Sequence, residues 1–165
     1  MIFVTVGTHE QPFNRLVKYM DDLKGKGVLE EEVIIQTGFS TYEPIHCTWS
    51  KFLPYQKMTE YAAGAHIVVT HGGPSSIFMP LQSGKIPIVV PRQKKYGEHV
   101  NDHQVEFAKQ TAQRQGNIIV AEDVDALEEL LVDYDNLIRS MPSGLHSNNA
   151  AFNEKFEKIV DELWG

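Results

Sequence analysis

Short apolar runs bounded by turn residues alternate along the chain with longer segments in which apolar residues recur every three or four positions. The first pattern is typical of buried strands, and the second is typical of helices that pack on one face. Their alternation predicts an α/β fold with an open parallel sheet flanked by helices. The predicted strands cover residues 2–6, 33–37, 45–48, 67–70, 86–90 and 118–120. The predicted helices cover residues 13–23, 56–63, 75–83, 102–115, 124–133 and 149–163.

Cap and turn signals organise the second half of the chain. Asn101 followed three residues later by Gln104 resembles a helix-capping arrangement, and Gly116 suits a left-handed helix end. Residues 139–149 have a turn-forming composition and predict a flexible connector. The helix after it, extended to residue 164 by Trp164, has an apolar face that either packs on the chain's own core, which we favour, or docks on another chain. No shift in composition divides the chain, so we expect residues 1–165 to form a single domain.

Charge, cysteine content and hydrophobicity bear on which ligands the protein can bind and on where in the cell it is expected. The formal net charge of −7 opposes binding to nucleic acid or to anionic lipid. Cys47 is the only cysteine, which rules out an internal disulfide, and no basic segment precedes the first apolar run, so we expect a cytoplasmic protein. No apolar stretch approaches the roughly 20 residues of a membrane span. Any membrane association is therefore expected to be peripheral, through a partner.

Loops at the carboxyl ends of the strands of an open parallel sheet converge on a crevice where ligands bind. The first such loop contains Gly7, Thr8 and His9. It lacks both the glycine fingerprint of dinucleotide-binding proteins and the lysine of a Walker A motif. Gly7 is therefore interpreted either as a turn residue or as part of a diphosphate site.

The second loop, residues 70–76, follows a very apolar strand and opens a helix. Its Gly-Gly pair permits close approach of the backbone to a ligand, and Ser75 or Ser76 can cap the helix or bond a phosphate oxygen. The helix dipole at this point favours negative charge. A tight turn with a capping serine would not need His71 together with two glycines, so we favour a phosphate-binding loop.

The third loop, residues 91–103, combines cations with hydrogen-bonding side chains. Arg92, Lys94 and Lys95 could neutralise a diphosphate, and the polar residues could bind sugar hydroxyls, although a solvated polar loop is an equally open interpretation. The polar candidates are Glu98, Asn101, Asp102, His103 and Gln104. His99 and His103 have a spacing found in metal sites, but no cysteine or clear third ligand accompanies them, so we expect no bound metal.

The loops and strands together resemble a known family. The matching segments are MIFVTVGT at 1–8, FLPY at 52–55, AHIVVTHGGP at 65–74, GKIPIVVPR at 84–92 and GEHVNDHQ at 97–104. This ordered set, which covers the chain to about Val120, resembles the glycosyltransferase family 28 carboxyl-terminal domain. The likeness extends to the catalytic subunits of bacterial exopolysaccharide and capsule β-1,4-galactosyltransferases and to the cytosolic subunit of the eukaryotic dolichol-linked N-acetylglucosaminyltransferase. It implies a Rossmann-like domain equivalent to the donor-binding C-terminal half of a GT-B glycosyltransferase.

The resemblance also implies roles for individual residues. Gly7 and Thr8 should lie near the diphosphate or the interdomain cleft, and Phe52 and Tyr55 should lie near the uracil. The residues expected to face phosphate and ribose are His71, Gly72, Gly73, Ser75 and Ser76. The residues expected to face the donor sugar are Glu98, Asn101, Asp102, His103 and Gln104. Arg92 would stabilise the leaving group, and His9, beside the cleft, is the candidate base unless the partner supplies one.

One position departs from the family pattern. Members commonly carry a glutamate early in the helix after the Gly-Gly loop, where it bonds the ribose hydroxyls, and this chain has Met79 there. Pro80 follows it, and proline is tolerated only near the start of a helix. We therefore expect recognition of the ribose to differ from the family pattern.

The function implied is transfer of galactose, or less favourably N-acetylglucosamine, from a UDP-sugar to a lipid-diphosphate-linked saccharide with inversion, in exopolysaccharide or capsule synthesis. The acceptor-binding half is absent from this chain, so a membrane-anchored partner subunit is implied, with this chain at the inner face of the membrane. Self-association in isolation stays open, because the missing half would leave a cleft exposed. The only ligand expected is the UDP-sugar, without a cofactor. Two alternatives stay open: a non-catalytic nucleotide-binding or stabilising subunit, and a metal-dependent hydrolase using His71, His99 and His103.

Overall fold

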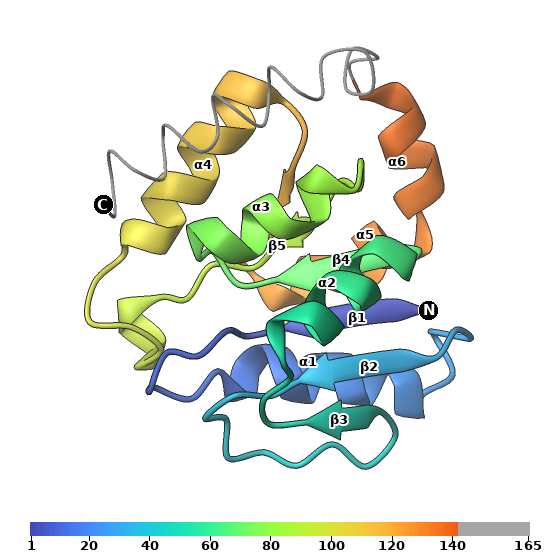
Figure 1. The fold of residues 1–165 in the computed structure, drawn as a ribbon, viewed down its shortest axis with the longest axis vertical. Coiled ribbons are helices and arrows are strands. Elements are labelled where there is room, and N and C mark those ends of the chain that lie inside the picture. The colour runs from blue at the N-terminus through green and yellow to red at the C-terminus, as the bar shows by residue number, and fades with distance from the viewer. Residues whose placement is uncertain (142–165) are drawn as a thin grey trace.

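A computed structural model of the chain describes residues 1–141. It contains a parallel sheet of six strands in the order β3-β2-β1-β4-β5-β6, with helices on both sides (Figure 1). The strands are β1 Ile2–Thr5, β2 Val33–Gln36, β3 Thr48–Ser50, β4 Ile67–Thr70, β5 Ile88–Val89 and β6 Ile119–Val120. The helices are α1 Asn14–Gly25, α2 Tyr55–Gly64, α3 Pro74–Gln82, α4 His103–Gln115, α5 Leu127–Val132 and α6 Tyr134–Ser140. Single 3-10 turns lie at Lys94–Tyr96 and Val124–Ala126.

The chain reverses its direction of travel across the sheet at β1. From β1 it moves outward to β2 and β3, and it then returns to place β4 on the other side of β1. Thr5 pairs with Gln36 on one side and with Thr70 on the other, so three strands end level with one another. An open α/β sheet binds ligands outside the carboxyl ends of the strands where this reversal occurs. The fold therefore places the loops after β1 and β4 at the expected ligand crevice.

Alternate residues of the central strands pack on opposite layers of helices. Ile2 and Val4 of β1 belong to a core cluster with α1, α5 and Tyr134 of α6. Phe3 faces the other way and packs with Ala62 of α2 and Met79 of α3. Because side chains alternate along a strand, both faces of the sheet are buried, as the continuous apolar strands predicted. None of the helices within residues 1–141 combines the length and the apolar character needed to cross a bilayer.

The edge strand β3 lies later in the chain than predicted. The expected strand at 45–48 is instead a loop in which Ile45 is 80% exposed, and only Thr48 belongs to the observed strand. The carboxylate of Asp21, buried in α1, accepts the backbone N–H groups of Ile45 and His46 at 2.8–3.1 Å and the Tyr42 hydroxyl at 2.6 Å. These backbone donors are therefore used by a side chain and are not available to a strand ladder.

Replacing Asp21 with Asn should destabilise the chain by about 2 kcal/mol, because an amide cannot accept all of these donors. Burial raises the pKa of Asp21, but the hydrogen bonds from Ile45, Tyr42, His46 and Cys47 outweigh it and leave the pKa below its ordinary value. The carboxylate's contribution is therefore complete above about pH 4 and is lost as the pH falls through the lowered folded-state pKa. Urea unfolding at neutral and acidic pH measures both effects.

The matched control for that prediction is Asp22→Asn. Asp22 is the next residue along the helix, and its 41% exposed carboxylate pairs with Lys18. Exposed pairs contribute little, so this variant should change the free energy of unfolding by about 0.5 kcal/mol or less. Equal losses for the two variants would contradict the role assigned to Asp21.

The predicted helix at 124–133 is divided, and a further helix follows it. Asp133 ends α5 and precedes α6, its backbone leaves the helical region, and its carboxylate accepts from Asn136 at 2.8 Å. The hydroxyl of Tyr134 donates to the Ile86 carbonyl at 2.7 Å, which fixes α6 against the body. The prediction of a connector from residue 139 was wrong at its start, because Arg139 and Ser140 belong to α6. The rest of that connector beyond Met141 and the helix at 149–164 lie outside the described residues.

The two cap predictions have different outcomes. Gly116 adopts a left-handed conformation at the end of α4, with φ of 66°, as predicted. The Asn101 side chain accepts the backbone N–H of His103 at 3.0 Å. However, Asp102 is the N-cap of α4 and no side chain caps it, so the predicted capping arrangement of Asn101 with Gln104 is not formed. Gln104 does not complete it, because its amide points instead to the loops after β4 and β5.

Candidate functional site

A cavity of about 420 Å³ lies at the carboxyl ends of β1 and β4, where the chain reverses direction. Eight residues predicted from the sequence line it: Gly7, Thr8, His9, Phe52, His71, Gly73, Ser75 and Ser76. Gln36, Leu53, Met58 and Pro74 complete the lining. The cavity therefore joins the first two predicted loops to the segment that precedes α2.

The imidazole of His71 is enclosed between the backbones of two loops. A Cβ atom added to Gly7 would lie 2.4 Å from its Nε2, and one added to Gly73 would lie 2.3 Å from its Cε1. Gly7 also has a φ of 78°, which side chains rarely adopt. Glycine is thus required at both positions by close approach to one side chain, and the ring joins the loop after β1 to the loop after β4.

Every ring nitrogen of His71 has a protein partner. Nδ1 accepts the Gly73 backbone N–H at 3.1 Å and lies 3.4 Å from the Gln104 amide nitrogen, while Nε2 lies 2.9 Å from Ser76 Oγ. Burial, together with the nearby Arg92 cation, lowers the pKa of His71 to about 3. The imidazole is therefore neutral at physiological pH, so it supplies hydrogen bonds and no charge to the cavity.

Gln36 is a cavity residue that the sequence analysis missed. Its Oε1 accepts from the Thr5 hydroxyl at 2.6 Å and from the Gly7 N–H at 3.1 Å. Its Nε2 donates to the carbonyls of Gly7 and Lys51 at 3.1 and 2.8 Å. Gln36 thus holds the loop after β1 against the segment that leads to α2. A glutamine at the end of an otherwise apolar strand was the available signal, because a buried amide must find partners.

Gln104 lies outside the cavity lining and connects the loop after β4 to the loop after β5. Its Oε1 accepts the backbone N–H groups of Gly72 and Arg92 at 3.1 and 3.0 Å. Gly72 must be glycine for this contact, because an added Cβ would lie 2.9 Å from the Gln104 Cβ. Gln104 was expected to face the donor sugar, whereas the structure buries it beneath the loops, where it positions them.

Arg92 is completely buried, although it was expected beside the diphosphate. Its guanidinium donates to the carbonyls of Val6 at 2.7 Å, Gln11 at 2.6 Å and Glu98 at 3.0 Å, and it lies 5.0 Å from the centre of the Phe13 ring. Its Nε has no hydrogen-bond partner within the described residues. Burial lowers the pKa of Arg92 to about 10, while Glu98 raises it, so the side chain stays a cation. Arg92 holds the first and third loops together from below the cavity.

The carboxylates of the third loop also point to the protein and not to the cavity. Glu98 is buried and forms a two-pronged ion pair with Arg15 of α1, at 2.9 and 3.0 Å. Asp102 accepts the Lys94 backbone N–H at 2.9 Å. Together with the hydrogen bond from the His103 backbone N–H to Asn101, these contacts shape the loop before α4. The sugar-facing roles expected for Glu98, Asn101 and Asp102 stay predictions, because these contacts do not show where a donor sugar would lie.

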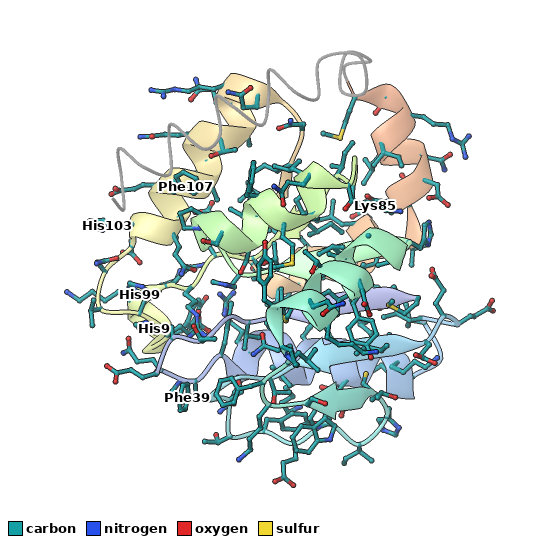
Figure 2. All side chains as sticks on the ribbon, viewed as in Figure 1. His9, Phe39, Lys85, His99, His103 and Phe107 are labelled. Carbon is teal, nitrogen blue, oxygen red and sulfur yellow. The ribbon has the colours of Figure 1, made fainter. Side chains whose placement is uncertain are left out.

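Two histidines from distant loops stack on each other, and one of them, His9, lines the cavity. The rings of His9 and His99 are 4.4 Å apart and nearly parallel, and Figure 2 shows them side by side between the loop after β1 and the loop before α4. His9 Nε2 lies 2.8 Å from the Gln11 side-chain oxygen. His103 is exposed at the first residue of α4. Among residues 1–141 no three His, Cys, Asp or Glu side chains are grouped to hold a metal ion, so the metal alternative has no site there.

Met79 lies in the core and not in the cavity. It is 8% exposed and packs with Phe3, Ala62 and Val68 beneath α2. The residues of α3 that reach the cavity are Pro74, Ser75 and Ser76, all in its first turn. Helix α3 contains Pro80 and ends at Gln82, close to the predicted range of 75–83. Of the two aromatic residues expected near the uracil, Phe52 lines the cavity and Tyr55 is 70% exposed outside the lining.

The lining combines neutral hydrogen-bond donors with an apolar wall. None of the described lining residues is Asp, Glu, Lys or Arg. At the start of α3, Pro74 has no N–H, and the Ser75 N–H makes no hydrogen bond within residues 1–141. This N–H and the hydroxyls of Thr8, Ser75 and Ser76 can therefore donate to a ligand at the positive end of the helix dipole. Phe52, Leu53 and Met58 form an apolar wall suited to a flat ring.

The strand order defines the class of the domain: an open parallel, Rossmann-like fold that matches the C-terminal half of GT-B glycosyltransferases. The model of the glycosyltransferase family 28 C-terminal domain matches residues 1–163, and the chain belongs to this family. No curated protein sequence matches the chain.

Solved glycosyltransferase structures share the fold at low sequence identity. The glycosyltransferase SnogD from Streptomyces nogalater is 15% identical with a TM-score of 0.56, over 94% of this chain and 38% of that one. The glycosyltransferase of kitacinnamycin is 19% identical with a TM-score of 0.53, over 96% and 42%. The calicheamicin glycosyltransferase CalG4 is 12% identical with a TM-score of 0.57, over 99% and 44%. The chain spans about two fifths of the length of these structures.

Proposed function

We propose that this chain is the UDP-sugar-binding catalytic subunit of a two-component inverting glycosyltransferase. The observation that carries the proposal is the cavity at the reversal point of a family 28 sheet, where neutral donors at the start of α3 face an apolar wall. Donors at a helix start suit a diphosphate, and the wall of Phe52, Leu53 and Met58 suits a nucleobase. A nucleoside diphosphate sugar contains both groups.

A second polypeptide is part of the proposal. The chain spans about two fifths of the glycosyltransferase structures that it resembles. The remaining part of the active site would come from a membrane-anchored, acceptor-binding subunit that holds a lipid-linked saccharide. This arrangement would place the chain at the inner face of the membrane in exopolysaccharide or capsule synthesis, with galactose as the preferred donor sugar and N-acetylglucosamine as the alternative.

The proposed reaction is a direct displacement at the anomeric carbon. The acceptor hydroxyl forms the new C–O bond while the bond to UDP breaks, and the diphosphate takes the bonding electron pair. A base accepts the hydroxyl proton, and His9 is the candidate in this chain, since it lines the cavity. The start of α3 stabilises the charge that develops on the departing UDP.

A non-catalytic subunit that only binds nucleotide is the second candidate. It is favoured by the core position of Met79, because this chain has no carboxylate in the described lining to bond the ribose hydroxyls. The two candidate functions differ in whether the complex with the partner turns over a UDP-sugar. Hydrolysis or transfer of a UDP-sugar by the chain together with its partner supports catalysis, whereas tight UDP binding without turnover in that complex supports the alternative.

Calorimetric titration with UDP, UDP-galactose, UDP-N-acetylglucosamine and a purine diphosphate tests the proposal. We expect selective binding of the uridine ligands, unchanged by EDTA because the described lining has no carboxylate. The affinity should change by less than about threefold between about 50 and 500 mM salt, since the donors are neutral and the Arg92 charge is buried. Loss of binding in EDTA, or equal affinity for the purine diphosphate, would contradict the proposal.

The exposed lysines of the third loop provide the control. Lys94 and Lys95 lie outside the cavity lining, so Lys94→Gln and Lys95→Gln should leave UDP affinity within about twofold of the wild type. A large loss of affinity in these variants, together with steep salt dependence, would place the diphosphate on the third loop instead of at the start of α3.

A further inference from the structure

The hydrogen bond between His71 and Ser76 connects a buried ring to a hydroxyl on the cavity wall. Nε2 of His71 lies 2.9 Å from Ser76 Oγ, and Ser76 lines the cavity. A hydroxyl can accept and donate, so the direction of this bond decides what the same hydroxyl offers to a ligand. The direction depends on which ring nitrogen of His71 carries the proton.

The surroundings of His71 fix the position of that proton. Gln104 Oε1 already accepts two backbone N–H groups, from Gly72 and Arg92, so its amide nitrogen faces Nδ1 of His71 at 3.4 Å. The Gly73 N–H also points at Nδ1, at 3.1 Å. Two N–H groups facing one nitrogen require that nitrogen to be an acceptor. Burial and the Arg92 cation disfavour a second proton, so the single ring proton lies on Nε2.

We infer that His71 is a positioning residue that turns the Ser76 hydroxyl into a hydrogen-bond donor to the ligand. Nε2–H donates to Ser76 Oγ, which leaves the hydroxyl proton of Ser76 to point into the cavity. The site then selects an acceptor atom at this point, and a phosphate oxygen of a nucleoside diphosphate is the chemical class that fits the start of α3. The identity of that acceptor rests on the proposed function, whereas the direction of the hydrogen bond does not.

The ring is closely packed against two glycines. A Cβ added to Gly7 would lie 2.4 Å from Nε2, and one added to Gly73 would lie 2.3 Å from Cε1. Ser76 Oγ makes no other hydrogen bond within residues 1–141. Gln104, which is bonded to the backbone of the third loop, therefore orients His71, and His71 orients the Ser76 hydroxyl at the cavity wall.

A double-mutant cycle tests this positioning role. In His71→Asn the amide oxygen can replace Nδ1 as the acceptor for Gly73, but the shorter side chain does not reach Ser76. We expect His71→Asn and Ser76→Ala each to raise the Kd for UDP about tenfold, the value of one hydrogen bond to a charged group. The double variant should also lose about tenfold, since both changes remove one interaction. Additive losses of about a hundredfold, or full affinity in His71→Asn, would overturn the inference.

Partial rescue separates positioning from general stability. His71→Gln places an amide N–H near the position of Nε2, so it should recover part of the affinity lost in His71→Asn. Thermal unfolding midpoints of the variants report on folding separately. If affinity follows the unfolding midpoint and not the ability to reach Ser76, His71 has only a structural role.

Nitrogen NMR of the ligand-free protein tests the hydrogen-bond direction without any ligand. We expect an unprotonated Nδ1 and a protonated Nε2 for His71, unchanged between about pH 5 and pH 8. A protonated Nδ1 would overturn the inference even if UDP binds. If this proton position is found but no uridine ligand binds, the proposed function fails while the hydrogen-bond direction stands, so the two failures are distinguishable.

Discussion

Gly7→Ala should destabilise the chain by about 3 kcal/mol and lower its affinity for UDP more than tenfold. The substitution has two costs. An alanine at φ of 78° costs about 1–2 kcal/mol, and its Cβ would lie 2.4 Å from Nε2 of the enclosed His71 ring. Relief requires movement of the loop after β1 or of His71, and either movement disturbs the cavity. Chemical denaturation and calorimetry measure the two effects.

Gly27→Ala separates the backbone cost from the contact cost. Gly27 has the same φ of 78°, but nothing lies within 4 Å of an added Cβ. We expect a loss of about 1 kcal/mol in stability and no change in UDP affinity. If the two variants lost equal stability and both bound UDP normally, the close contact between Gly7 and His71 would have no energetic importance.

Arg92→Met should cost about 4 kcal/mol of folding free energy, the largest loss that we expect from a single side chain outside the core. The substitution leaves three carbonyls, those of Val6, Gln11 and Glu98, without the donors that now reach them at 2.6–3.0 Å. It also removes the buried cation that helps to keep His71 neutral. Guanidinium unfolding measures the loss, and weaker UDP binding should accompany it.

Arg114→Met is the matched control for that substitution. Arg114 lies exposed in the last turn of α4, far along the helix from the cavity loops. Its replacement should change stability by about 0.5 kcal/mol or less. A small loss for Arg92→Met, similar to that of the control, would show that water replaces the guanidinium beneath the loops.

The sequence predicted the sheet because the central strands are apolar on both faces. Runs such as 2–6 and 67–70 are apolar almost throughout, which is typical of strands in a parallel sheet covered on both sides, and the structure confirms these strands. The edge strand was misplaced because its position depends on Asp21, which is distant in sequence and takes the N–H groups of Ile45 and His46. Local apolar pattern carries no information about such a side-chain acceptor.

The cavity was predictable in its loops but not in the direction of its side chains. The Gly-Gly loop and the serines after it were identified from residue type alone, and the structure places His71, Gly73, Ser75 and Ser76 at one cavity. Arg92 was interpreted as ligand-facing because a cation can neutralise a diphosphate, and Glu98 because the family resemblance implied a place at the donor sugar. Both are buried, with partners on α1 and the loop after β1 that are more than 75 positions away in sequence. Pairing across such distances requires the three-dimensional structure.

The enclosure of His71 between two glycine backbones divides the cavity into a part that tolerates substitution and a part that does not. The side formed by Gly7, His71 and Gly73 has no room for a larger residue. Phe52, Leu53 and Met58 have apolar side chains that hold no loop by hydrogen bonds, so a change in their size alters packing and leaves the hydrogen bonds of the loops in place. A change in which nucleotide is accepted, whether by natural divergence or by design, is therefore accessible through this apolar wall and costly on the other side.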